Sequence, residues 1–110
     1  MAEFIKGDVI VIPFPFSDLS TLKRRPALVI ATPIGNDIIV CQITSKFHND
    51  LYSIQLDNND FIEGSLNQLS YIRPNKIISI DKGIIKYKVG SLTNGKLTIV
   101  IDKIIEIIKS

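Results

Sequence analysis

The residues of this chain that could do chemistry stand at the ends of apolar runs. Arg24 and Arg25 precede Pro26 in the run RRPALVI. Pro26 disfavours the helical region for the residue before it, so Arg25 is expected to be extended as it enters a strand. An extended arginine on a rigid strand can present its planar fork to a phosphate through two hydrogen bonds. The alternative interpretation is a solvated surface arginine.

Hydroxyl groups and a second basic cluster extend this pattern. Thr44 and Ser45 end the run IIVCQITS, where they could donate to a phosphate oxygen or bind the backbone of a turn. Ser20 lies in the loop before the arginines and has the same two interpretations. Arg73 and Lys76 belong to the segment SYIRPNKI, whose alternative interpretation is a bulged strand with solvated charges.

Several other chemistries are excluded or disfavoured by the sequence. His48 is the only histidine, so two histidines cannot act as acid and base, and we interpret it as a solvated loop residue. One histidine and one cysteine do not predict a zinc site, and a single cysteine excludes an internal disulfide. We expect Cys41 to be a buried, unreactive thiol, and the carboxylates Asp57, Asp60 and Glu63 to form an ordinary polar loop. No glycine-rich phosphate-binding motif is present, and no metal or cofactor is expected.

Short segments rich in Ile and Val predict the strands that position these residues. They are Asp8–Phe14, Ala27–Pro33, Asp37–Ser45, Tyr52–Leu56, Leu69–Arg73 with Ile77–Asp81 close behind it, and Ile84–Ser91. The residues Asp57–Asp60 and Glu63–Gly64 indicate a longer polar connection between strands. Short strands at regular spacing favour a small barrel or sandwich.

The C-terminal segment has a helical period instead. Its apolar residues recur three and four positions apart, at Leu97, Val100, Ile101, Ile104, Ile105 and Ile108. Thr93 or Asn94 could cap this helix. Burial of the apolar face can outweigh the weak helix propensity of β-branched residues, so we expect a helix that packs on the barrel, including its IIEIIKS end.

Composition sets limits on size and partners. The chain has 110 residues, 45% of them hydrophobic, and a formal net charge of +2. This length predicts a single domain, residues 1–110, and the weak net charge predicts local rather than general contact with nucleic acid. No apolar run reaches membrane-spanning length, and a lone cysteine fits a reducing compartment, so we expect a cytoplasmic protein without membrane contact.

The order of these motifs resembles the MazF/PemK family of toxins from end to end. The resemblance rests on GDVIVIPFPFS, RRPALVI, VCQITS, SYIRPNKIISID, KVGSLTNGKL and a final helix. It implies a mainly β fold, an SH3-like small antiparallel barrel (CcdB/MazF-like) with a C-terminal helix, that forms a homodimer. It also implies a toxin of a type II toxin–antitoxin system, an endoribonuclease that cleaves single-stranded RNA, usually mRNA, at specific sequences without metal, and that binds a cognate antitoxin.

The resemblance also implies roles for particular residues. Arg25 and Thr44 match the family's catalytic pair. The residues expected to contact RNA are Ser20, Arg24, Ser45, Lys46, Arg73 and Lys76. The chain departs from the family pattern at Leu19-Ser20-Thr21, at Lys76 in place of a glutamine, and in the short loop after Thr44, which lacks the usual proline. These departures bear on the RNA sequence that is recognised.

The implied chemistry is coherent, because RNA carries its own nucleophile, the 2′-OH. The protein then has to orient the phosphate and neutralise developing charge. Arg25 could stabilise the transition state, and Thr44 could orient the phosphate. Two alternatives remain: a CcdB-like inhibitor that binds DNA gyrase and cleaves nothing, and a catalytically silent barrel that only binds a partner.

Overall fold

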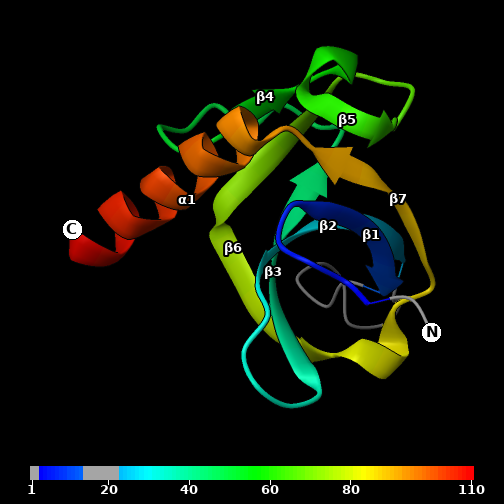
Figure 1. The fold of residues 1–110 in the computed structure, drawn as a ribbon. Coiled ribbons are helices and arrows are strands. Elements are labelled where there is room, and N and C mark those ends of the chain that lie inside the picture. The colour runs from blue at the N-terminus through cyan, green and yellow to red at the C-terminus, as the bar shows by residue number, and fades with distance from the viewer. Residues whose placement is uncertain (1–2, 14–22) are drawn as a thin grey trace.

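The computed structural model describes residues 3–13 and 23–110 and shows a mainly β fold. Its strands are β1 (Asp8–Pro13), β2 (Arg24–Ala31), β3 (Asp37–Thr44), β4 (Ile54–Leu56), β5 (Phe61–Gly64), β6 (Ser70–Asp81) and β7 (Tyr87–Leu92). They form one antiparallel sheet in the order β4-β6-β3-β2-β1-β7-β5, which curls into a half-barrel (Figure 1). The helix α1 (Asn94–Lys109) follows β7, so the expected β-barrel class with a C-terminal helix is confirmed.

Several bounds of the predicted strands differ from the structure: β2 begins at Arg24 and ends at Ala31 instead of spanning Ala27–Pro33, and β4 begins at Ile54 instead of Tyr52. Three larger differences concern whole elements. β5 was not predicted, because its sequence FIEG is short and largely exposed and follows a 3₁₀ turn, η1 (Asn58–Asp60), capped by Asp57. The predicted start at Ile84 is wrong, because a second 3₁₀ turn, η2 (Lys82–Ile84), precedes β7. The two segments predicted around Arg73 and Ile77 join in one strand, β6.

Two apolar cores form on opposite faces of the sheet. Cys41 and Ile43 of β3 point into the core that α1 covers, while Ile38 and Val40 point into a second core on the other face. A strand that is buried on both faces reads as a continuous apolar run, as IIVCQI does. Cys41 is buried, as expected, and burial raises the pKa of its thiol to about 12.

The helix begins at a capped N-terminus and ends beyond the sheet. The Thr93 side chain accepts a hydrogen bond from the Lys96 N–H (3.2 Å), which confirms Thr93 as the cap. Val100 and Ile104 are buried against the sheet. The expectation that the IIEIIKS end packs as core holds for Ile104 and is wrong beyond it: Ile105 is 45% and Ile108 72% exposed, because the last turns run past the sheet (Figure 1). Within the described residues, no helix is both long and apolar enough to cross a membrane.

Candidate functional site

An open groove of about 430 Å³ lies on the sheet face opposite α1. Its lining residues are Lys23, Arg25, Gln42, Thr44, Ser45, Lys46, His48, Arg73 and Lys76. Five of them are cationic, and none of the described lining residues is a carboxylate. A groove with charge of one sign concentrates ligands of the opposite sign, so this surface is suited to a polyanion.

Strand alternation places Arg25, Gln42 and Thr44 on one face of the sheet. Gln42 pairs with Ala27, which lies two residues after Arg25 on β2, and Thr44 lies two residues after Gln42 on β3. Side chains two residues apart in a strand share a face. The polar end of that face is therefore the groove floor, and the second apolar core continues it at the other end.

The Arg25 guanidinium has an unused donor. Its Nε atom is buried and has no hydrogen-bond partner among the residues that the structure describes. A buried donor without a partner is unfavourable, so an anion that accepted this hydrogen bond would recover that cost. The neighbouring Arg24 is exposed, does not line the groove, and by strand alternation points to the opposite face.

A bulge in β6 turns two cations into the same groove. Cys41 of β3 pairs with Ile77 and the next residue, Gln42, pairs with Arg73, so three residues of β6 have no partner on β3. Pro74 lies in this interruption, where its missing N–H costs no ladder hydrogen bond. Without the bulge Arg73 and Lys76 would face opposite sides of the strand; with it both line the groove.

The Thr44 hydroxyl shapes a turn through its oxygen and can still donate its proton to a ligand. Its hydroxyl oxygen accepts a hydrogen bond from the Lys46 N–H (3.1 Å), which shapes the turn at the end of β3. A hydroxyl that accepts one bond still has its own proton to donate. Both interpretations made from the sequence, a turn residue and a phosphate donor, are thus compatible with the geometry.

The loop after β3 is tied to the groove wall by Asp50. Its carboxylate accepts hydrogen bonds from the Tyr52 and Ser53 N–H groups, both at 2.9 Å, and pairs with Arg73 Nη2 at 3.2 Å. These backbone donors, and then the Arg73 guanidinium, lower the pKa of Asp50 to about 2. The ion pair therefore fixes the guanidinium of Arg73 and holds the loop that carries Lys46 and His48.

The structure brings together most of the predicted site residues. Those that line the groove are Arg25, Thr44, Ser45, Lys46, Arg73 and Lys76. Arg24 does not, and Ser20 lies outside the described residues. Lys23, Gln42 and His48 were missed: the spacing of Gln42 from Thr44 was the available signal, whereas nothing in the sequence showed that the half-buried His48 would turn into the groove.

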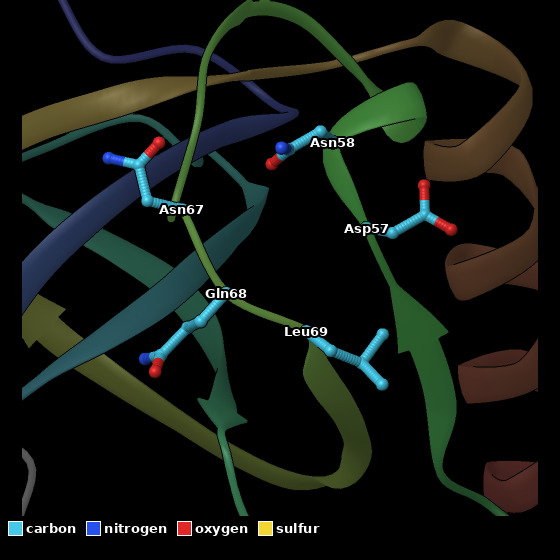
Figure 2. Close-up of a pocket in the computed structure, with 5 residues that line it drawn as sticks. All are labelled: Asp57, Asn58, Asn67, Gln68 and Leu69. Atoms are coloured by element: carbon cyan, nitrogen blue, oxygen red, sulfur yellow. The ribbon is translucent and has the colours of Figure 1, made fainter.

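A second pocket, of about 160 Å³, has a different chemistry (Figure 2). It lies where the segment that follows β4 faces the segment that enters β6, and its residues are Asp57, Asn58, Asn67, Gln68 and Leu69. The Ser65 hydroxyl lies 2.6 Å from Asn58 Oδ1 and 3.2 Å from Asn67 Oδ1, so local contacts occupy these amides. The described residues that line this pocket include one carboxylate and no cation, so it does not favour a phosphate. In the described ranges no cluster of three or more His, Cys, Asp or Glu residues could hold a metal ion.

Comparison by sequence identifies a family. A family profile described as "PemK-like, MazF-like toxin of type II toxin-antitoxin system" matches residues 5–108. No curated protein matches the chain.

Solved structures share the fold at low sequence identity. A mycobacterial endoribonuclease in complex with its cognate antitoxin is 11% identical, with a TM-score of 0.75 over 94% of this chain and 93% of that one. The toxin MazF-mt6 of Mycobacterium tuberculosis is 18% identical, with a TM-score of 0.69 over 88% of this chain and 91% of that one. The MazE-MazF structure from Deinococcus radiodurans is 17% identical, with a TM-score of 0.69 over 94% of this chain and 92% of that one.

Proposed function

The chain belongs to the PemK-like, MazF-like toxins of type II toxin–antitoxin systems, a family of endoribonucleases, and we propose that its cationic groove is the site where it cleaves single-stranded RNA. The proposed substrate is mRNA in the cytoplasm, cut at specific sequences without a metal ion. Arg25 and Thr44 are the proposed catalytic residues. The remaining groove cations position the RNA backbone.

In the proposed reaction the RNA supplies the nucleophile. The 2′-OH next to the scissile phosphate loses its proton and its oxygen attacks phosphorus, while the bond from phosphorus to the 5′ oxygen breaks and that oxygen gains a proton. The products are a 2′,3′-cyclic phosphate and a 5′-OH, and no water is consumed in this step. Arg25 neutralises the extra negative charge on the phosphoryl oxygens, and the Thr44 hydroxyl donates to one of them.

The observation that carries the proposal is the buried Arg25 Nε, which has no partner within residues 3–13 and 23–110 and lies in the same groove as Thr44. A preorganised donor that is already desolvated does not have to reorganise when charge develops. The phosphate would satisfy it and would also meet the hydroxyl of Thr44. The other four cations extend the groove beyond one phosphate, as a single-stranded substrate requires.

The proposed partners are a second copy of the chain and an antitoxin. Ile105 is 45% exposed and Ile108 72%, and an exposed apolar helix face of this kind is typical of an interface. We propose a two-fold homodimer and an acidic antitoxin segment whose carboxylates compete with RNA phosphates for Arg25; Arg24, on the other face, is left out of this competition. Light scattering that gave a monomer at micromolar concentration would contradict the dimer, and antitoxin that bound without slowing cleavage would contradict the competition.

The test of the proposed activity is to incubate purified protein with a long natural RNA in excess chelator and to sequence the new 5′ ends. We expect 5′-OH ends at a recurrent motif. Arg25→Ala and Thr44→Val should each slow cleavage by at least about a hundredfold, the scale for one lost charge-stabilising donor. Thr44→Ser, which keeps the hydroxyl, is the matched control and should stay active. Intact RNA with a folded wild-type protein would favour a non-enzymatic role instead.

A further inference from the structure

An aromatic pair stands at the edge of the groove without belonging to either core. Phe47, in the loop after β3, is 66% exposed, and its ring lies 5.5 Å from the ring of Tyr71 with an interplanar angle of 66°. Neither residue is among those that pack in the two apolar cores. Burial in the fold therefore does not explain why a phenylalanine occupies this position.

The register of the sheet places the pair next to the proposed catalytic residues. Tyr71 is the direct partner of Thr44 across β3 and β6, and it lies two residues before Arg73 on the same face of β6. Directly paired residues of antiparallel strands have Cβ atoms only about 5 Å apart. Phe47 itself is flanked by Lys46 and His48, which both line the groove.

The geometry of the pair leaves a ring face open. In an edge-to-face contact one ring uses its edge and keeps both faces, while the other uses one face and keeps the second. Phe47 therefore retains at least one uncovered face whichever role it has, and its exposure makes that face accessible to solvent. Tyr71 holds the ring against the sheet, and the Asp50–Arg73 ion pair holds the loop.

We propose that Phe47, supported by Tyr71, is a stacking platform for one base of the RNA whose phosphates lie in the groove. Proteins that bind single strands combine a cationic path for the backbone with aromatic rings on which bases stack, and this surface has both parts side by side. The identity of the ligand as RNA rests on the proposed function. The platform adds a base-binding site beside the scissile phosphate and makes Phe47 a determinant of where the RNA is cut.

The test measures binding separately from cleavage. The probe is a fluorescein-labelled RNA oligonucleotide that contains the mapped cleavage motif and deoxyribose at the cleaved position, so that it binds and is not cut. Phe47→Ala should weaken its binding by roughly 5- to 150-fold, the range for one lost base–aromatic stack. Phe47→Trp should preserve binding. Phe47→Leu should lose nearly as much as Phe47→Ala, because it keeps the apolar character and lacks the ring.

A series of oligonucleotides with one abasic position each identifies the stacked base. At one position the missing base should weaken binding to the wild type and have no further effect on Phe47→Ala. Tyr87→Ala is the matched control, because Tyr87 is a 55% exposed aromatic residue on β7, which β1 and β2 separate from β3 in the sheet. That variant should bind every oligonucleotide as the wild type does.

The outcomes separate this inference from the proposed function. If the wild type cuts no RNA, the probe is an unstructured all-ribose oligonucleotide of mixed sequence; binding to it that depends on Phe47 would overturn the endoribonuclease and leave the platform standing. Protein that cuts RNA normally, with equal binding by the wild type and Phe47→Ala, would overturn the platform alone. Loss of antitoxin binding with unchanged RNA binding in Phe47→Ala would show that the ring serves a protein partner, and would also overturn it.

Discussion

The salt dependence of RNA binding can be worked out from the charges of the groove. Five cationic side chains line it among the described residues, and the Asp50 carboxylate pairs with Arg73, so at most four of them are available to neutralise phosphates. For single strands the logarithm of the binding constant falls with the logarithm of salt concentration by about 0.7 per neutralised phosphate. If four phosphates are neutralised, the slope is about −2.8, and raising salt from about 50 to 200 mM weakens binding about fifty-fold.

Removing one groove cation should make the dependence of RNA binding on salt less steep by about 0.7. Lys23→Gln should move the slope from about −2.8 to about −2.1, because one phosphate is no longer neutralised. Lys23 is exposed and lies before β2, so the substitution should leave the fold intact. The matched control is Lys86→Gln, because Lys86 is also exposed and does not line the groove; its slope should equal that of the wild type.

The assay is fluorescence anisotropy of the deoxyribose-blocked oligonucleotide at a series of KCl concentrations. Each variant then gives one slope, and differences between slopes do not depend on small errors in protein concentration. A wild-type slope shallower than about −1 would mean that the groove contacts at most one or two phosphates. An equal change in Lys23→Gln and Lys86→Gln would mean that general surface charge, rather than the groove, binds RNA.

Three further predictions follow from individual contacts. Arg25→Lys should keep the wild-type salt slope but cut RNA more slowly in single-turnover assays, because a point charge does not replace the planar fork; wild-type turnover would refute the role of the fork. Asp50 has a folded-state pKa of about 2 against an ordinary 3.8, so its charged form stabilises the fold above about pH 4 and this contribution is lost as pH falls toward 2. The difference in Tm between wild type and Asp50→Asn should therefore shrink over that range, and a constant difference would contradict the assignment. The Cys41 thiol, buried and with its pKa raised to about 12, should react with a thiol reagent only after unfolding, so rapid labelling of the native protein would be inconsistent with its position.

The strand ends that carry Arg25 and Thr44 could be predicted from the sequence, because both signals are local. Pro26 sets the backbone of the residue before it, and a hydroxyl after an apolar run marks the end of a strand. The rule of alternation then also places Gln42 beside Thr44. The end of β3 at Thr44 agrees with this reasoning to one residue, whereas β2 begins at Arg24, three residues before the predicted strand, so that Arg25 lies inside β2.

The remaining features depend on contacts between distant residues. The position of the loop after β3 depends on the pair of Asp50 with Arg73, 23 residues away, so the approach of His48 to the groove has no sequence signal. The offset of the bulge in β6 is set by its pairing with β3, and Pro74 signals only that an irregularity exists. The helical period predicted an apolar helix face that includes Ile108. Ile108 stays exposed because the helix extends beyond the sheet, and the sequence of the helix does not show where the sheet ends.

The central claim is that the groove of Arg25 and Thr44 cleaves RNA through the substrate's own 2′-OH. The most direct measurement is single-turnover cleavage of two oligonucleotides in excess EDTA, identical except for ribose or deoxyribose at the cleaved position. The account predicts that only the ribose oligonucleotide is cut, giving a 5′-OH fragment and a 2′,3′-cyclic phosphate. Cleavage of the deoxyribose oligonucleotide, or cleavage of the ribose one only after magnesium is added, would contradict it.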